Sequence, residues 1–301
     1  MEKTYKSGFA AIVGRPNVGK STLLNSLLGE KVAIITNKPQ TTRNMVRGII
    51  TTDEAQIVFV DTPGMHIAKD KLSENMVKMA ENSIKNGDVV LFMTAPAEKS
   101  DIHPADVEIL KGLAKVSAAK FLLINKVDLV DKGRLLPIME AYNNACPFDE
   151  TIPISALKGE NLLNLRETIV KYLPAGPKFF PDDMMTDAPD KFIISEMIRE
   201  KALYLLQEEI PHGIAVEITQ LKKREGKEIV DIEATIYCEK NSHKGIIIGK
   251  GGAMLKEIGI RSRKDIQRIY EEKVNLQMWV KIKENWRDSD FFMRNFGFKA
   301  D

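Results

Sequence analysis

The segment from Gly14 to Ser21 reads GRPNVGKS, and it constrains the fold of this chain more than any other feature. It matches the pattern G-x-x-x-x-G-K-[S/T], a glycine-rich loop whose backbone N–H groups wrap around phosphate. An apolar run from Phe9 to Val13 precedes it, and leucines at helical spacing follow it between Lys20 and Leu28. A buried strand, a phosphate loop and a helix in this order indicate the start of an α/β domain.

Each part of this loop has an expected task. The glycines allow the backbone to approach the β-phosphate, Lys20 is expected to reach the β- and γ-phosphates, and the Ser21 hydroxyl is expected to bind Mg²⁺. The alternative is a chance glycine-rich turn, which the strand and helix on either side disfavour. The expected phosphate-binding residues are Gly14, Asn17, Val18, Gly19, Lys20, Ser21 and Thr22.

Strand and helix patterns alternate through the first 173 residues, which we expect to form one domain. Asp53 and Glu54 separate two β-prone runs and predict a hairpin. The expected strands are 9–13, 46–51, 56–60, 89–93, 121–124 and 152–154, and the expected helices are 20–28, 72–86, 103–116, 134–145 and 161–172. This order predicts a mostly parallel, doubly wound sheet with helices on both faces.

A proline-rich stretch, residues 174–190, predicts a linker to a second domain at 191–301. The second domain is expected to be a smaller α+β unit in the order α-β-β-α-α-β. The patterns behind this order are a helix at 191–210, strands at 214–221 and 228–237, a glycine-rich segment at 245–252, a helix at 254–273 and a strand at 276–283.

Charge and composition narrow the function classes. The chain has 44 basic and 42 acidic residues among 301, but the stretch from Lys240 to Arg268 holds eight basic residues against two acidic ones. Such a stretch is either a contact for a polyanion or a solvated helix face. Two cysteines exclude a disulfide framework and a four-cysteine zinc site. The polar start and the lack of a long apolar run predict a soluble, cytoplasmic protein.

A second candidate segment for the phosphate site follows a predicted strand. Asp61, with Thr62, Pro63 and Gly64, ends the strand at 56–60, where a carboxylate can serve Mg²⁺ and the Gly64 N–H can sense a γ-phosphate. The segment from Asp61 to Gly64 is weak evidence alone, because a strand-ending turn looks the same. About forty residues separate it from the phosphate loop, and the two together are a strong signal.

The segment from Asn125 to Asp128 chooses the base. A carboxylate at Asp128 accepts two hydrogen bonds from the ring N–H and the exocyclic amine of guanine, a donor pair that adenine lacks. Asn125 can meet the other base edge, and the Lys126 stem can lie over the ring. A backbone N–H for the guanine oxygen is expected from the segment after the next strand, which consists of Ser155, Ala156 and Leu157.

These four segments, in this order and spacing, resemble a small GTPase domain of the translation-factor-related class. The resemblance places Gln40 to Arg43 at the first switch, where Thr42 would coordinate Mg²⁺ only when the γ-phosphate is present. Thr41 is the competing candidate, and spacing does not separate the two. The implied Mg²⁺ ligands are Ser21, Thr42 and Asp61, and the implied switch residues are Thr41, Thr42, Asp61, Thr62, Pro63, Gly64 and Met65.

Met65 stands where fast GTPases often place a glutamine that orients the attacking water. A thioether cannot do so, which predicts slow intrinsic hydrolysis or charge stabilisation from elsewhere. In related GTPases with asparagine at the position of Asn17, a potassium ion sits beside the phosphates. The resemblance therefore implies Asn17 as a K⁺ ligand.

The glycine-rich segment of the second domain resembles the KH nucleic-acid-binding motif. Its G-x-x-G loop would be Gly249 to Gly252, a tight turn between helices that lies against about four nucleotides. A glycine turn in an accessory domain is the alternative. The implied RNA-binding residues are Ile248, Gly249, Lys250, Gly251, Gly252 and Lys256. The aromatic residues near the C-terminus form either a packed tail, which we favour, or stacking partners for bases.

A GTPase domain followed by this KH variant resembles the Era family of bacterial GTPases over essentially the whole chain. The resemblance implies a switch that binds and hydrolyses GTP, with Mg²⁺ and GTP or GDP as ligands. It further implies binding near the 3′ end of small-subunit ribosomal RNA, a part in assembling that subunit, and peripheral association with the cytoplasmic face of the membrane. We expect a monomer. Two alternatives remain open: an RNA-binding adaptor with a structural nucleotide, and a GTPase in tRNA modification.

Overall fold

The computed structural model describes residues 4–36, 38, 41–65, 70–97, 102–207, 210–296 and 298. The chain forms two compact units. The first unit comprises Met1–Ala33, Thr42–Lys69 and Ser73–Asp187, and the second comprises Ile34–Thr41, Asp70–Leu72 and Ala188–Asp301. The expected domains were continuous, whereas the second unit also includes two short segments from the N-terminal half of the chain.

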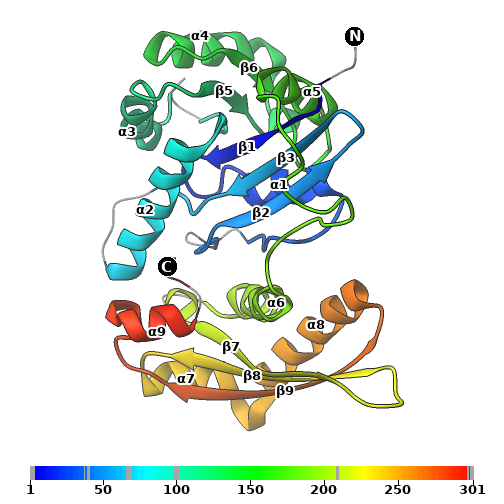
Figure 1. Cartoon of the computed structure of the whole chain (residues 1–301). Coiled ribbons are helices and arrows are strands. Elements are labelled where there is room, and N and C mark those ends of the chain that lie inside the picture. Colours follow the sequence, from blue (N-terminus) through cyan, green and yellow to red (C-terminus); the bar gives the residue numbers. More distant parts are fainter. Residues whose placement is uncertain are drawn as a thin grey trace. The chain divides into compact units, whose positions relative to one another are not determined.

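The first unit is built on a six-stranded sheet in the order β2-β3-β1-β4-β5-β6. All neighbouring strands are parallel except β2 and β3, which form the expected hairpin. The mostly parallel, doubly wound sheet is therefore confirmed (Figure 1). Its elements are β1 (Lys6–Val13), α1 (Lys20–Leu28), β2 (Val46–Thr51), β3 (Ala55–Asp61), α2 (Lys71–Asn86), β4 (Val89–Thr94), α3 (Pro104–Leu113), β5 (Ala119–Ile124), α4 (Leu135–Ala145), β6 (Glu150–Pro153) and α5 (Leu162–Tyr172).

Helices cover both faces of this sheet because alternate strand residues point to opposite sides. On one face, Phe92 of β4 and Leu122 of β5 belong to a buried cluster that α2, α3 and α4 complete. On the other face, Phe121 of β5 packs edge-on against Tyr172 of α5, with ring centroids 5.0 Å apart. Strands buried on both faces explain the continuous apolar runs in the sequence.

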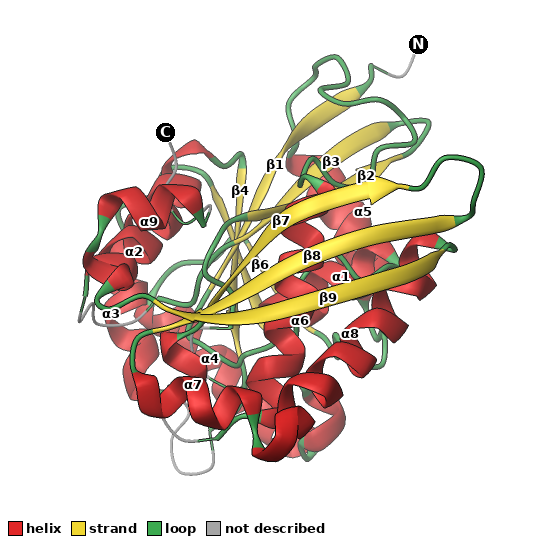
Figure 2. Cartoon of the chain, turned by 90° about the horizontal axis from the view of Figure 1, so that it is seen from below, coloured by secondary structure: helices red, strands yellow, loops and turns green. Residues whose placement is uncertain are grey.

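The second unit is an α+β fold with a three-stranded sheet in the order β7-β8-β9. Strands β7 and β8 are antiparallel, β8 and β9 are parallel, and the helices at 190–205, 241–248 and 253–270 pack against one face (Figure 2). This arrangement confirms the order α-β-β-α-α-β. The elements are α6 (Asp190–Leu205), β7 (Ala215–Lys223), β8 (Ile229–Cys238), α7 (Asn241–Ile248), α8 (Ala253–Tyr270), β9 (Lys273–Ile282) and α9 (Asp290–Asn295).

The C-terminal aromatic residues pack within the second unit. Trp286 is fully buried, and its indole N–H donates to the carbonyl oxygen of Gly213 at 3.0 Å. Phe296 and Phe298 lie against the Trp286 ring, with centroids 5.5 and 5.6 Å away. Only Phe291 of these residues is largely exposed, so the geometry favours a packed tail over a set of base-stacking rings.

Candidate functional site

The predicted nucleotide segments gather at one edge of the first sheet. The loop from Gly14 follows β1, Asp61 ends β3, Asn125 follows β5 and Ser155 lies just beyond β6. Because these strands are parallel, their carboxyl ends lie at the same edge, where open α/β sheets bind ligands (Figure 1).

Two glycines of the phosphate loop are required by close backbone approaches. A Cβ at Gly14 would lie 2.2 Å from the carbonyl oxygen of Met93, and one at Gly19 would lie 2.4 Å from Nδ2 of Asn125. Gly19 also has a φ of 107°, in the region that side chains disfavour. The loop is thus held tightly against the ends of the neighbouring strands β4 and β5.

Lys20 lies along the inside of this loop. Its Nζ donates to the carbonyl oxygens of Gly14 at 3.0 Å and Arg15 at 3.1 Å. Burial lowers the pKa of Lys20 to about 8, although the nearby Asp61 carboxylate favours the charged form. A cation held at a loop rich in N–H donors forms an anion-binding site.

Ser21, Thr42 and Asp61 bring oxygen atoms together beside the loop. The Ser21 hydroxyl donates to Oδ2 of Asp61 at 2.6 Å, and its Oγ lies 2.9 Å from Oγ1 of Thr42. Asp61 is fully buried, and its Oδ1 has no hydrogen-bond partner within the described part of the chain. Burial raises the pKa of Asp61 to about 6, against the opposing effects of Lys20 and Ser21.

This donor set suits Mg²⁺, which binds oxygen ligands and commonly takes one or two carboxylates together with substrate phosphates and water. The unpartnered Oδ1 of Asp61 gives a buried oxygen that a cation would satisfy. In the residues described, no group of three or more His, Cys, Asp or Glu side chains could hold a metal. The candidate metal site is the set of two hydroxyls and one carboxylate at Ser21, Thr42 and Asp61.

The two switch threonines differ in their surroundings. Thr42 is the one beside Ser21, whereas the Thr41 hydroxyl donates to the carbonyl oxygen of Lys38 and lies 2.6 Å from Oγ1 of Thr36. Thr41 belongs to the second unit, where the buried Arg199 of α6 donates to its carbonyl oxygen. Gln40, which the sequence also placed in this switch, lies outside the described residues.

The segment after β3 runs close to the phosphate loop. The Thr62 hydroxyl donates to the carbonyl oxygen of Ile12 at 2.8 Å, and the Met65 N–H donates to that of Gly14 at 3.2 Å. A Cβ at Gly64 would lie 2.9 Å from the Pro16 ring. The Met65 side chain packs against the apolar cluster around α3 and α4, so this chain presents no water-orienting side chain at that position.

Asn125 and Lys126 tie the base segment to the phosphate loop. The Asn125 amide donates to the carbonyl oxygen of Val18 at 2.7 Å and accepts from the Ala156 N–H at 2.8 Å. Nζ of Lys126 donates to the carbonyl oxygen of Asn17 at 3.0 Å. We predicted that these residues face the base. In the structure their hydrogen bonds brace three loops against one another.

Asp128 is exposed and is oriented by a neighbour that the sequence did not single out for this task. The Ser155 hydroxyl donates to Oδ1 of Asp128 at 2.7 Å and accepts from the Lys158 N–H at 3.2 Å. The Ala156 N–H donates to Asn125 and the Ser155 N–H donates to the carbonyl oxygen of Glu160 at 3.3 Å, whereas Leu157 is exposed. The carboxylate is thus presented to solvent in a fixed orientation.

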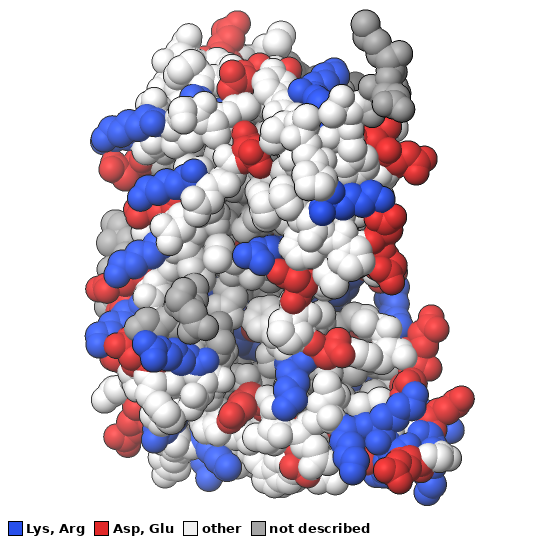
Figure 3. All heavy atoms as spheres, in the orientation of Figure 1, with Lys and Arg blue, Asp and Glu red and all other residues white. Residues whose placement is uncertain are grey.

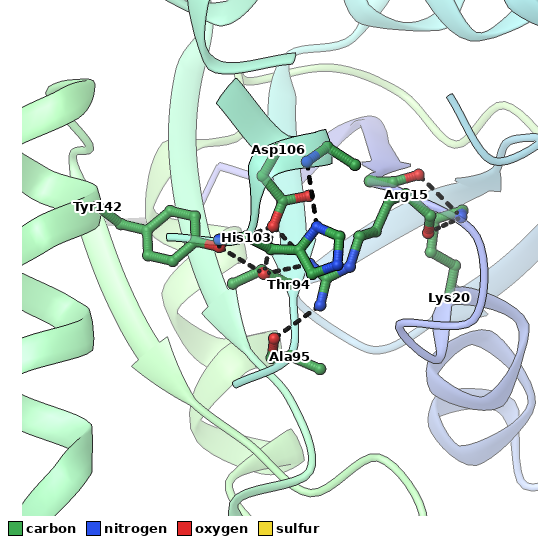
Figure 4. A network of polar contacts seen from close by, with 9 residues as sticks. Arg15, Lys20, Thr94, Ala95, His103, Asp106 and Tyr142 are labelled. Atoms are coloured by element: carbon green, nitrogen blue, oxygen red, sulfur yellow. Dashed lines mark hydrogen bonds and ion pairs between the residues drawn. The ribbon is translucent and has the colours of Figure 1, made fainter. Parts of the chain in front are cut away.

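Arg15 is a further residue that motif reasoning missed, because it occupies a variable position of the loop pattern. Its guanidinium points away from Lys20 toward Thr94 and Asp106 (Figure 4). The available signal was a second charged residue in the loop besides Lys20.

The predicted RNA loop joins α7 to α8. Gly249 has a φ of 73°, and a Cβ there would lie 2.7 Å from Cβ of Met254, so the two helices approach closely at this point. Lys250 and Lys256 are exposed, and a Cβ at Gly251 would meet open space. The turn therefore offers an accessible backbone with two lysines beside it.

Basic side chains also gather over the turn between β7 and β8, at the lower right of Figure 3. Part of this charge is neutralised within the unit, because Arg224 pairs with Asp231 and Lys223 pairs with Glu272. This second basic cluster is distinct from the α7–α8 turn.

Two family profiles match the chain. The family described as "50S ribosome-binding GTPase" matches residues 9–126, and the KH domain family matches residues 209–287. GTPase Era of Clostridioides difficile is 52% identical over 98% of this chain and 99% of its own length. GTPase Era of Caldanaerobacter subterraneus is 50% identical over 99% of each chain.

Two solved structures share the whole fold. One is Era in complex with MgGDPNP and nucleotides 1506–1542 of 16S ribosomal RNA, with a TM-score of 0.94, 42% identity and coverage of 98% of this chain and 100% of that chain. The other is a variant of Aquifex aeolicus Era bound to GDP and aluminium fluoride, with a TM-score of 0.93, 43% identity and the same coverage. Full-length likeness at this level of identity shows that the chain is a member of the Era family of GTPases.

Proposed function

We propose that this protein is a GTP-dependent switch that binds the 3′ region of small-subunit ribosomal RNA and assists assembly of the small subunit. The observation that carries the proposal is that the predicted nucleotide-binding segments meet at one edge of the first sheet in a chain that also has a KH domain. The whole chain is similar to an Era solved with MgGDPNP and nucleotides 1506–1542 of 16S ribosomal RNA. The GTPase unit would report its nucleotide state, and the KH unit would hold the RNA.

In this proposal Ser21, Thr42 and Asp61 hold Mg²⁺ together with the phosphates. The converging oxygens and the unpartnered Oδ1 of Asp61 support this assignment. When bound, Mg²⁺ neutralises charge on the β- and γ-phosphates. Thr42 is favoured over Thr41 because its hydroxyl already lies beside Ser21.

Hydrolysis would be slow, since the packed Met65 cannot orient water. We place a potassium ion near Asn17 as the source of additional positive charge. Asn17 has a φ of 64°, and its carbonyl oxygen is fixed by Lys126, so the asparagine sits at a rigid corner of the phosphate loop. A fixed cation there opposes the charge that develops on the leaving group.

The RNA contact is assigned to the turn between α7 and α8, with Ile248, Gly249, Lys250, Gly251, Gly252 and Lys256 as its residues. An exposed glycine backbone lies close to a sugar-phosphate chain more readily than a side-chain-covered surface does. The two exposed lysines supply charge at the same place.

The experiment replaces both lysines, Lys250→Glu and Lys256→Glu, and measures binding of an RNA with the sequence of 16S nucleotides 1506–1542. The matched control, Lys222→Glu with Lys227→Glu, makes the same charge change at exposed positions of the β7–β8 turn. We expect RNA affinity to fall at least about thirtyfold in the first variant, with GTP affinity unchanged. The control should lose RNA affinity by a factor several times smaller, also with GTP affinity unchanged. Equal losses in the two variants would contradict the assignment, because they would indicate a diffuse electrostatic effect.

We place the protein in the cytoplasm as a monomer with peripheral membrane contact. No helix within the described ranges is long and apolar enough to cross a membrane. Sedimentation with lipid vesicles tests the contact, and the sedimentation coefficient of the free protein tests the oligomeric state.

A further inference from the structure

The guanidinium of Arg15 hydrogen-bonds to protein groups on the side of the loop that faces away from Lys20. Its Nη1 donates to Oγ1 of Thr94 at 2.7 Å and to Oδ2 of Asp106, and its Nη2 donates to the carbonyl oxygen of Ala95 at 2.7 Å (Figure 4). These partners lie at the end of β4 and in the first turn of α3. The fork geometry of arginine suits several acceptors at once.

Asp106 is the centre of this network. Its side chain is fully buried, and besides Arg15 its Oδ2 accepts from the hydroxyls of Thr94 and Tyr142, each at 2.7 Å. Every proton has a place: the Thr94 oxygen accepts from Arg15, and the Tyr142 oxygen accepts from the His103 N–H at 3.2 Å. Three donors thus converge on Oδ2, whereas Oδ1 is buried and has no hydrogen-bond partner among the described residues.

Tyr142 anchors the network from α4. The side chain is 1% exposed, and its ring packs against Phe92 with centroids 6.1 Å apart. Burial raises the pKa of Tyr142 to about 12, so the phenol remains a donor at neutral pH. Helices α3 and α4 thus both reach the phosphate loop through one carboxylate.

The Arg15 backbone connects this network to the phosphate site. Its carbonyl oxygen accepts from Nζ of Lys20 at 3.1 Å, while its side chain is held by Asp106. If Arg15 turned away, the carbonyl that places Lys20 would turn with it. Removing one partner of a buried ion pair leaves an uncompensated charge, which the loop would relieve by moving.

We propose that Asp106, supported by Thr94 and Tyr142, is a positioning residue that holds Arg15 and thereby sets the shape of the phosphate loop. The loop wraps the β-phosphate, which GDP and GTP share, so the network governs the affinity for both nucleotides alike. It also explains why Arg15, although cationic and inside the loop, does not act on the γ-phosphate. The proposal rests on the guanine-nucleotide site described above.

The test compares Asp106→Asn, Tyr142→Phe and Arg15→Gln in the full chain. The control is Glu108→Gln on the same helix, which removes a charge from an exposed pair with Lys111. For Asp106→Asn we expect affinity for GDP and for a non-hydrolysable GTP analogue to fall together by about tenfold, through faster dissociation. Glu108→Gln should match the parent in both affinities.

Tyr142→Phe removes one donor to the carboxylate and keeps the ring, so we expect the same pattern with a smaller loss. The double variant Arg15→Gln, Asp106→Asn should bind GDP no more weakly than the single variant with the lower GDP affinity. Both substitutions break the same ion pair, so their effects should not add. A purely structural role would lower the melting temperature and leave nucleotide affinity unchanged well below the melting transition.

The proposal is overturned if Asp106→Asn, folded by circular dichroism, binds GDP within twofold of the parent. It is also overturned if Arg15→Gln lowers turnover while GDP affinity stays intact, since Arg15 would then act at the γ-phosphate. Should Asp106→Asn fail to fold, Tyr142→Phe and Arg15→Gln decide by the same criteria. Failure of the parent to bind guanine nucleotides would instead refute the nucleotide site itself.

Discussion

Replacing Asp128 with asparagine tests base recognition by changing one carboxylate oxygen to an amide nitrogen. The carboxylate is exposed, and its Oδ1 is oriented by the Ser155 hydroxyl at 2.7 Å. Two hydrogen bonds from guanine would reach this charged acceptor, and each such bond contributes about 1.5–3 kcal/mol. Asp128→Asn should therefore weaken GDP binding by about 3–6 kcal/mol, or roughly 10²–10⁴-fold.

The same change should admit xanthine nucleotides. Xanthine carries an oxygen where guanine has an amine, so an asparagine N–H can donate to that oxygen while its carbonyl accepts from the ring N–H. Equilibrium titrations with GDP and xanthosine diphosphate measure both effects on one protein preparation. We expect the ratio of the two affinities to invert relative to the parent.

Two further variants calibrate this measurement. Ser155→Ala removes the bond that orients the carboxylate, and we expect a loss of about 1 kcal/mol for GDP with no gain for the xanthine nucleotide. Asp131→Asn removes an exposed charge three residues away and should leave both affinities unchanged. Guanine affinity within threefold of the parent in Asp128→Asn, without a gain for xanthine, would refute the reasoning.

Two other predictions follow from the same unit. Turnover in KCl should exceed that in NaCl, and Asn17→Ala should remove the difference while GDP binding persists; equal rates in both salts for the parent would exclude the potassium assignment. Because the pKa of Tyr142 is raised to about 12 from an ordinary 10, the folded state holds this proton longer than the unfolded state. The stabilisation from Tyr142 is thus full below pH 10 and lost toward pH 12. Urea unfolding should show the stability advantage of the parent over Tyr142→Phe shrinking by on the order of 1 kcal/mol between pH 9 and 11, and a constant advantage would contradict the raised pKa.

Local sequence patterns were sufficient for the fold of each unit. Strands buried on both faces appear as apolar runs, and α1 begins at Lys20 and ends at Leu28 as its leucine spacing predicts. The two short segments that join the second unit could not be predicted from local patterns. Residues 34–41 and 70–72 join the second unit through tertiary packing, and no composition change marks them.

At the candidate nucleotide site, motif spacing predicted which segments meet but not all of the contacts between them. Spacing left Thr41 and Thr42 equivalent, and only the fold shows Thr42 beside Ser21. The bracing bonds of Asn125 to Val18 and Ala156 depend on loops that are far apart in the chain. Such contacts depend on how the strand ends meet and cannot be read from any one segment.

The Arg15 network lay furthest from sequence reasoning. Asp106 is on α3, where an acidic residue in the first turn is ordinary helix chemistry, and Tyr142 is an apolar-face residue of α4. Neither position carries a motif. Their connection exists only because the sheet brings both helices to the end of β4.

Phosphate release from GTP, with and without an RNA of 16S nucleotides 1506–1542, tests the central claim most directly. A GTPase switch that engages RNA should release phosphate slowly alone, faster with the RNA, and not at all after Lys20→Ala. The acceleration should disappear in the Lys250→Glu, Lys256→Glu variant while the basal rate stays. The account would be contradicted if the parent bound the RNA equally well with GDP and GTP and released phosphate at the same rate with and without the RNA.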